Sequence, residues 1–224
     1  MRTSRKKDIA SQTIVATAER LFAQHGITQV SLRQIRQEAG SANNFAVQYH
    51  FQDRAGLVRA VYERRTPQLE MRRSELLELT KAAGREREPA ALLESILRPY
   101  SEIVDEDGQR NYAAFQLKLY TVERDPTYMD AIQVPPVTAH ISSLLGQSLP
   151  HLPDKIYRYR IGSAGVIFMD AMVRLNEGIA PLDVEGMVQE ALSLGTAVLT
   201  APYQGLRLED AVAALAGGAV SETV

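Results

Sequence analysis

The sequence lacks several features that would place it in whole classes of protein. It contains no cysteine, which excludes disulfides, thiolate nucleophiles and cysteine-ligated zinc and fits a reducing compartment. No run approaches the roughly 18 apolar residues that a membrane helix needs, and no apolar stretch of signal-peptide length follows the basic residues of 1–7. We therefore expect a soluble, cytoplasmic protein with no membrane partner.

Signatures of catalysis are lacking as well. The chain contains no glycine-rich phosphate loop, no His-Glu-x-x-His and no Gly-x-Ser-x-Gly pattern. Its four histidines form no obvious metal-ligand pair. We expect no enzyme activity, no metal and no cofactor. A catalytic group assembled from scattered residues, and a helical adaptor that binds other proteins, are the alternatives.

What is present is an ordinary globular composition with an uneven distribution of charge. The 224 residues are 45% hydrophobic and 23% charged, enough to bury the core of one large domain or two small ones. The net charge of -2 hides two opposite halves. Residues 1–65 hold 11 Lys/Arg against 5 Asp/Glu, whereas 66–224 hold 14 against 22. A basic N-terminal region suggests a polyanionic partner, the alternative being a solvated basic face.

Nearly every segment has helical periodicity, and the turn pairs typical of hairpins are missing. These patterns predict an all-α fold of about nine helices. We expect Pro67 to stop or kink the helix that begins at Arg54, with Thr66 capping a restart, and Pro135-Pro136 to break another helix. The predicted helices are 8–25, 31–39, 42–48, 54–66, 68–83, 89–105, 110–123, 127–149, 154–177 and 183–200, with a further helix considered at 206–216.

The segment 31–39 has well-defined ends. Ser31 is suited to cap its first turn, and Gln34 completes a Ser-x-x-Gln capping box. Val30 and Ile35 occupy the two positions of a hydrophobic staple, and Gly40 ends the helix. Together with the short helix expected next, this forms a helix-turn-helix, whose second helix enters the major groove of DNA.

Apolar positions, glycines and aromatics between residues 10 and 63 follow one order: Ala18-Glu19-Arg20-Leu21-Phe22, Gly26, the turn 28–32, Ile35, Ala39-Gly40, Tyr49-His50-Phe51, Asp53-Arg54 and Leu57. This order resembles that of the TetR family of one-component transcriptional repressors. The family usually has ten residues from the Ala-Gly turn through the His-Phe pair, whereas 41–51 is eleven. The extra residue predicts a wider turn around 41–43.

The resemblance implies a helical effector-binding domain and a homodimer formed by the last two main helices. Members of this family usually repress transcription by binding a near-palindromic operator, and a small-molecule effector relieves the repression. We therefore expect a DNA-binding domain at 1–65, a ligand-binding and dimerisation domain at 66–202, and a partly helical tail at 203–224. The expected partners are double-stranded DNA, a second copy of the chain and an unidentified effector. The break at Thr66-Pro67 is our candidate for the joint that transmits effector binding.

Several residues of the helix-turn-helix suit contacts to bases. Asn43, Asn44 and Gln48 can read adenine edges, although capping is the alternative for the asparagines and surface solvation for Gln48. Phe45 can touch a thymine methyl group or pack in the core.

Other residues of the same segment suit contacts to phosphates. The free amides after Ser31 can hold a phosphate, and Tyr49, His50 and Arg54 suit backbone contacts. Packing is the alternative for His50. The candidate DNA-binding residues are Ser31, Arg33, Ser41, Asn43, Asn44, Phe45, Gln48, Tyr49, His50 and Arg54.

The acidic part of the chain offers two further hypotheses. Apolar and small residues at helical spacing on 154–177 and 183–200 predict a dimer interface, with ordinary intrachain core as the alternative: Ile161, Gly165, Phe168, Met172, Val188, Leu192, Gly195 and Leu199. Aromatics in the middle helices predict an effector pocket, with simple core as the alternative: Tyr100, Tyr112, Phe115, Tyr120, Tyr128, His140, Phe168 and Met172.

Overall fold

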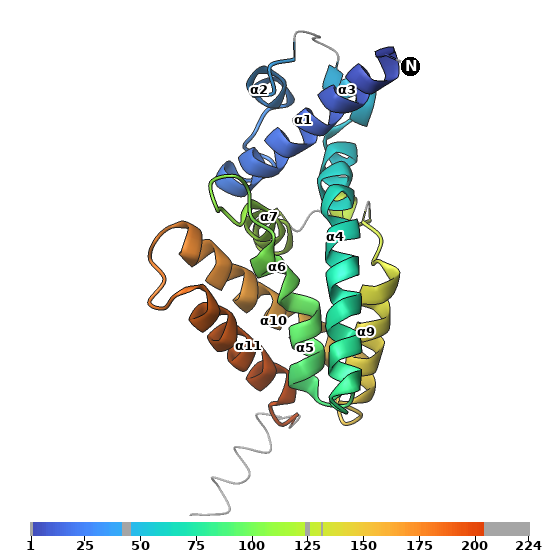
Figure 1. Cartoon of the computed structure of the whole chain (residues 1–224), viewed down its shortest axis with the longest axis vertical. Helices are drawn as coiled ribbons and strands as arrows, with labels where there is room; N and C mark the ends of the chain where they lie inside the picture. The colour runs from blue at the N-terminus through green and yellow to red at the C-terminus, as the bar shows by residue number, and fades with distance from the viewer. Residues whose placement is uncertain (1, 42–45, 124–125, 131, 204–224) are drawn as a thin grey trace, which may run out of the picture.

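The computed structural model describes residues 2–41, 46–123, 126–130 and 132–203. The only regular secondary structure in this part of the chain is helical, with no strand, so the all-α prediction is confirmed. The short helices α2 and α3 lie with α1 at one end of the molecule, and the remaining helices form a larger body below them (Figure 1). None of the described helices combines the length and the apolar character that crossing a bilayer requires.

The first helix, α1 (Arg2–His25), begins earlier than the predicted residue 8. We call the end of the molecule that holds α1, α2 and α3 the head. The apolar stripe of α1 forms its centre, because Ile14, Ala18 and Phe22 are completely buried. The helix ends at Gly26, whose φ of 93° is a left-handed conformation that glycine adopts without steric cost. The amide of Gly26 donates to the Phe22 carbonyl at 3.0 Å and closes the last turn.

The second helix, α2 (Leu32–Glu38), begins where its sequence signals place it. Ser31 Oγ accepts a hydrogen bond from the Gln34 amide at 3.0 Å, which confirms the predicted cap. The second half of the predicted capping box was wrong, because the Gln34 side chain does not return to Ser31 and donates forward to Glu38 at 3.1 Å. The predicted staple residues Val30 and Ile35 are both buried, so the entry of the chain into α2 is fixed by packing as well as by the cap.

The third helix, α3 (Ala46–Phe51), ends later than predicted. The prediction of 42–48 was wrong at its C-terminal end, and residues 42–45 lie outside the described part of the chain. The helix ends because Gln52 adopts a φ of 65°, a left-handed conformation that stops a helix. Asp53 then caps the next helix by accepting the Gly56 amide at 2.8 Å. Tyr49, His50 and Phe51 therefore belong to α3.

The fourth helix, α4 (Arg54–Ala82), runs from the head into the body, so the prediction that Pro67 stops the helix and that a new one begins there was wrong. The Thr66 hydroxyl does not cap a new helix; it donates to the Tyr62 carbonyl, four residues back, at 2.9 Å. Val61 and Leu69 are buried on either side of the proline, and this packing holds α4 together although Pro67 cannot donate to the helix ladder.

The body is built from the helices that follow α4. Pro99 separates α5 from α6, and Pro135-Pro136 separates α8 from α9 as predicted. The predicted helix 110–123 ends in a π-helical turn, η1. The bounds are α5 Pro89–Leu97, α6 Pro99–Glu102, α7 Asn111–Lys118, η1 Leu119–Glu123, α8 Pro126–Asp130, α9 Pro136–Gln147, α10 Asp154–Asn176 and α11 Val184–Thr200.

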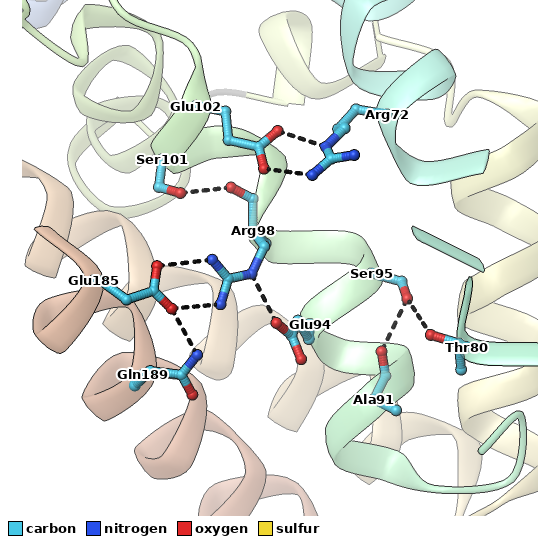
Figure 2. Close-up of polar contacts among 10 residues, drawn as sticks. All are labelled: Arg72, Thr80, Ala91, Glu94, Ser95, Arg98, Ser101, Glu102, Glu185 and Gln189. Carbon is cyan, nitrogen blue, oxygen red and sulfur yellow. Dashed lines mark hydrogen bonds and ion pairs between the residues drawn. The ribbon is translucent and has the colours of Figure 1, made fainter. Parts of the chain in front are cut away.

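Polar contacts tie the helices of the body together, and Figure 2 shows them around the end of α5. Arg98 donates two hydrogen bonds to Glu185 of α11, at 2.9 and 3.0 Å, and one to Glu94 at 2.7 Å. Arg72 of α4 reaches Glu102 of α6 at 2.8 Å. α4, α5, α6 and α11 are thereby linked at one level of the body.

Two contacts join α1 of the head to α4 and to α7. The Glu19 side chain of α1 is only 3% exposed and pairs with Arg64 at 2.8 Å and Arg65 at 2.7 Å, both on α4. α1 also packs against α7, where the rings of Phe22 and Phe115 stack with centroids 6.3 Å apart. The head thus contacts the body through α7 as well as through the continuous α4.

Candidate functional site

The helix-turn-helix carries a basic cleft between α2 and the junction of α3 with α4. The cleft has a volume of about 720 Å³. The polar residues that line it are Arg33, Arg36, Gln48, Gln52, Asp53 and Arg54. Three guanidinium groups outnumber the single carboxylate, that of Asp53, and together with the two amides they suit the phosphates and base edges of a nucleic acid.

The predicted residues Arg33, Gln48 and Arg54 meet in this cleft, whereas Arg36 and Gln52 were not predicted. Arg36 follows Arg33 by three residues, so both lie on the same side of α2, a spacing that the sequence could have revealed. Its Nη1 donates to the Ser41 carbonyl at 3.0 Å, so Arg36 also holds the end of α2. Within the described residues, neither Arg33 nor Arg36 forms an ion pair.

Arg54 was predicted to contact a phosphate, and in the structure its side chain binds backbone carbonyls of the same chain. Its Nη1 donates to the carbonyl oxygens of Ile27 and Val30, in the turn between α1 and α2. The side chain therefore anchors the start of α4 to that turn. Because these bonds occupy Nη1, a phosphate contact would use the other nitrogens of the guanidinium group.

The other predicted DNA-binding residues lie around the cleft or outside the residues that the structure describes. Ser31 is exposed at the start of α2, and Tyr49 is 65% exposed on α3. His50 is half-buried against the rings of Tyr49 and Phe51, at centroid distances of 5.3 and 5.9 Å. Ser41 is half-buried beside Arg36. Asn43, Asn44 and Phe45 lie outside the described residues.

In the body, three of the predicted pocket aromatics gather around a buried arginine that the sequence did not single out. Arg73 is 3% exposed and lies over the Tyr100 ring, 5.2 Å from its centroid. The rings of Tyr100 and Tyr112 stack at 5.8 Å. We call Tyr62, Tyr100, Tyr112 and Tyr120 with Arg73 the tyrosine cluster.

The hydroxyl groups of the tyrosine cluster influence one another. Burial, and then repulsion by neighbouring phenols, raises the pKa of Tyr62 to about 12 and raises that of Tyr112 well above its usual value. Tyr120 is 37% exposed, yet burial of its hydroxyl end next to Tyr100 and Tyr62 also raises its pKa. At neutral pH the phenols of Tyr62, Tyr112 and Tyr120 are therefore protonated.

Gln116 adds an unusual feature to the tyrosine cluster. Its side chain is completely buried on α7, and its Nε2 donates to the Tyr112 hydroxyl at 2.8 Å. Its Oε1 has no hydrogen-bond partner within the described residues. A buried amide oxygen without a partner costs about 1–3 kcal/mol, so it calls for an explanation. Tyr62, Arg73 and Gln116 carry no sequence signal that distinguishes them from ordinary helical residues.

The remaining predicted pocket residues do not join the tyrosine cluster. Phe115 contacts Tyr112 but faces Phe22 of the head. Phe168 and Met172 are completely buried in the core, and Tyr128 is buried on α8. His140 is exposed on α9 and lies apart from these buried residues.

The predicted dimer residues are divided between two faces of α10 and α11. Phe168, Met172, Val188, Leu192 and Leu199 are buried within the single chain, which fits the intrachain core considered as the alternative. A Cβ added to Gly195 would meet Leu93 and Ala164 of the same chain, so this position also faces the intrachain core. A side chain at Gly165 would meet nothing within 4 Å, and Ile161 is half-buried.

The described residues contain no group of three or more His, Cys, Asp or Glu side chains that could hold a metal ion. Residues 14–61 match the model of a family described as bacterial regulatory proteins, tetR family. The matched region begins within α1 and ends within α4, so it contains the whole basic cleft. A comparison with curated proteins gives no match to the chain.

Proposed function

The chain carries the N-terminal helix-turn-helix of a tetR-family DNA-binding transcriptional regulator, and we propose that it is a cytoplasmic repressor that a small-molecule effector releases from DNA. The observation that carries the proposal is the basic cleft inside the matched region, where Arg33, Arg36 and Gln48 lie together. α3 would enter the major groove, while α2 and the start of α4 would hold the phosphates on either side.

The proposal assigns 1–65 to DNA binding and 66–202 to sensing and dimerisation. α4 crosses this boundary without a break. The charge of the two parts suits these tasks, since the basic residues gather in the part that would meet DNA. Two heads held roughly 34–36 Å apart would read the halves of a near-palindrome.

Binding to DNA is tested with short duplexes from the DNA that flanks the coding region. We expect specific binding of two chains per duplex and a steep loss of affinity with salt. Arg33→Ala should weaken binding at least tenfold, because it removes an exposed guanidinium of the cleft. Arg85→Ala is the control, since Arg85 is also exposed but lies beyond the C-terminal end of α4, where it pairs with Glu88. Equal affinity for flanking and scrambled duplexes would count against an operator there.

A homodimer would use the outward face of α10 and α11. Gly162 and Gly165 have open space above them, and Tyr159 and Leu194 are 73% and 48% exposed. An apolar cleft of about 530 Å³ is also lined by residues of α10 and α11, among them Val166, Ile167 and Leu194. We expect Leu194→Glu to convert a dimer into a monomer in sedimentation equilibrium, because it places a charge in this surface. A wild-type monomer at micromolar concentration would contradict this part of the proposal.

Effector binding would change the spacing of the two heads, and it can do so only through different affinities for the two arrangements. Our sequence-based candidate for the joint was Thr66-Pro67, but α4 is continuous there. The stacked rings of Phe22 and Phe115 offer a second connection from the body to the head. We expect Phe115→Leu to reduce the effector's influence on DNA affinity more than Pro67→Ala does.

A further inference from the structure

A second charged cleft lies where the head meets the body, and it shares no lining residue with the basic cleft. We call it the junction cleft; its volume is about 630 Å³. α1 and the first part of α4 form its head side, and the loop between α6 and α7 forms its body side (Figure 1). We call this loop, residues 103–110, the acidic loop, because it carries three consecutive carboxylates: Asp105, Glu106 and Asp107.

The head side of the junction cleft is basic. Three arginines and one glutamate line it: Arg20, Arg64, Arg65 and Glu19. Glu19 is shared by Arg64 and Arg65, and Arg20 pairs with Glu38 at 2.7 Å. Among the contacts of the described residues, Arg64 donates only through Nη1. The other nitrogens of its guanidinium group are therefore available to a second carboxylate.

The acidic loop is held in one shape by its own hydrogen bonds. Asp105 Oδ1 accepts the amides of Asp107 at 3.0 Å and of Gln109 at 2.8 Å. Asp105 Oδ2 accepts the Asn111 side chain at 2.6 Å, so both oxygens of Asp105 are occupied within the loop. The side chains of Glu106 and Asp107 are exposed, and neither accepts a bond from another described residue. These two carboxylates are therefore available to the head.

The acidic loop is fastened to the body. The Arg110 amide donates to the Asn176 side chain, at the end of α10, at 2.9 Å. The Nε of Arg110 donates to the Ser101 carbonyl of α6 at 3.1 Å. We therefore expect the loop to move with α6 and α10. Arg64 and Arg65 instead move with α1, because both are bound to Glu19.

Two surfaces of opposite charge thus line the junction cleft, and in the described part of the chain no ion pair connects them. Beside the cleft, α1 contacts α7 through the stacked rings of Phe22 and Phe115, 6.3 Å apart. Phe22 follows Arg20 by two residues, and Phe115 lies one turn beyond Asn111, which lines the cleft. This contact is placed where a pivot between head and body would be needed.

We propose that the acidic loop is an electrostatic latch: the carboxylates of Glu106 and Asp107 close onto the arginines of the head and set its angle to the body. Exposed ion pairs are individually weak, so the open and closed arrangements are close in energy and salt shifts the balance between them. The proposal rests on the proposed function only where it concerns DNA, because the angle of the head decides how α3 meets an operator. The closing itself is observable without DNA.

The absence of cysteine from the sequence makes the closing measurable. Val104→Cys is combined with Ala16→Cys in one variant and with Thr17→Cys in another, since all three residues line the junction cleft. A disulfide forms only when the two Cα atoms come within about 7 Å, so the rate of oxidation reports how often the cleft closes. We expect at least one pair to crosslink about fivefold faster at about 20 mM than at about 500 mM salt.

Two charge variants test whether the acidic loop is responsible. Glu106→Gln with Asp107→Asn should remove the dependence of the crosslinking rate on salt, because the available carboxylates are gone. Glu78→Gln with Glu86→Gln removes the same charge from exposed positions around the C-terminal end of α4 and should leave the dependence unchanged. The proposal is overturned if neither pair crosslinks, if salt has no effect on the rate, or if the two charge variants behave alike.

A second readout separates this proposal from the proposed function. The crosslinked protein and the same protein after reduction are titrated with the flanking duplex, and we expect their affinities to differ at least about tenfold. Salt-dependent crosslinking in a protein that binds no duplex specifically would support the latch and contradict the repressor. Specific DNA binding with salt-independent crosslinking would support the repressor and overturn the latch. Specific binding with equal affinity before and after reduction would overturn the role of the latch in setting the head.

Discussion

The head and the body each bury a polar side chain, and they treat it in opposite ways. Glu19 in the head is 3% exposed and accepts bonds from both Arg64 and Arg65. Gln116 in the body is fully buried and leaves one oxygen without a partner among the described residues. The first arrangement fixes the angle between α1 and α4. The second leaves one buried hydrogen-bond acceptor unused.

The largest effect should come from breaking the paired site. Glu19→Gln would leave two arginines without their carboxylate at a mostly buried position, and we expect it to lower the free energy of unfolding by about 3 kcal/mol. Chemical denaturation measures this. Glu38→Gln, which removes the partner of Arg20 in an exposed pair, is the control and should have a much smaller effect. Equal effects would show that burial of Glu19 is unimportant.

A second prediction compares the packing of the head with the open face of the body. A Cβ on Gly56 would lie 2.0 Å from the Phe51 carbonyl oxygen, whereas one on Gly165 would meet nothing within 4 Å. We expect Gly56→Ala to cost about 2 kcal/mol and to weaken DNA binding, because α3 must shift. Gly165→Ala should leave monomer stability unchanged or slightly higher. Denaturation and duplex titration measure both; a tolerated Gly56→Ala would contradict the close approach.

The third prediction concerns the unpaired site and has the opposite sign. Gln116→Leu should raise the free energy of unfolding of the ligand-free protein by about 1 kcal/mol, because the cost of the buried oxygen disappears. The counterpart in the head, Glu19→Leu, should destabilise, because it leaves Arg64 and Arg65 without a partner. Chemical denaturation of both variants measures these two changes in the free energy of unfolding. A loss of stability in Gln116→Leu would mean that the Gln116 amide oxygen accepts a hydrogen bond in the wild-type protein.

The smallest effect should appear at an exposed pair of the body. The bonds from Arg98, and then from Gln189, lower the pKa of Glu185 from 4.5 to about 2. A lowered pKa in the folded state means that the stabilisation is complete above pH 4.5 and is lost as the pH falls toward 2. Because the Glu185 side chain is 61% exposed, we expect a contribution below about 1 kcal/mol. Glu185→Gln should reduce the dependence of the free energy of unfolding on pH between 4.5 and 2. An unchanged dependence would contradict the pairing of Glu185 with Arg98.

Much of the head was predictable because its signals are local. The Ser31 cap, the glycine after α1 and the Asp53 cap each depend on residues within a few positions of one another. The aromatic and glycine order over 14–61 also fits a known family. The end of α3 was missed because it depends on a glutamine in a left-handed conformation, which the residue type does not favour.

The tyrosine cluster of the body was only partly predictable, because its residues come from distant segments. The sequence indicated Tyr100, Tyr112 and Tyr120, but Arg73 and Gln116 look like ordinary polar residues of an amphipathic helix until the fold buries them. The same holds for α10 and α11, where helical spacing predicts an apolar stripe and cannot say whether it faces a partner or the chain's own core. The continuity of α4 through Pro67 likewise depends on packing around Val61 and Leu69.

Anisotropy titration of a flanking duplex with wild-type protein and with Arg33→Ala shows whether the basic cleft binds DNA. At two salt concentrations, we expect wild-type protein to prefer this duplex over a scrambled one and to lose affinity steeply with salt. Arg33→Ala should bind at least tenfold more weakly with a shallower salt dependence. Equal binding of both proteins to both duplexes would contradict the claim.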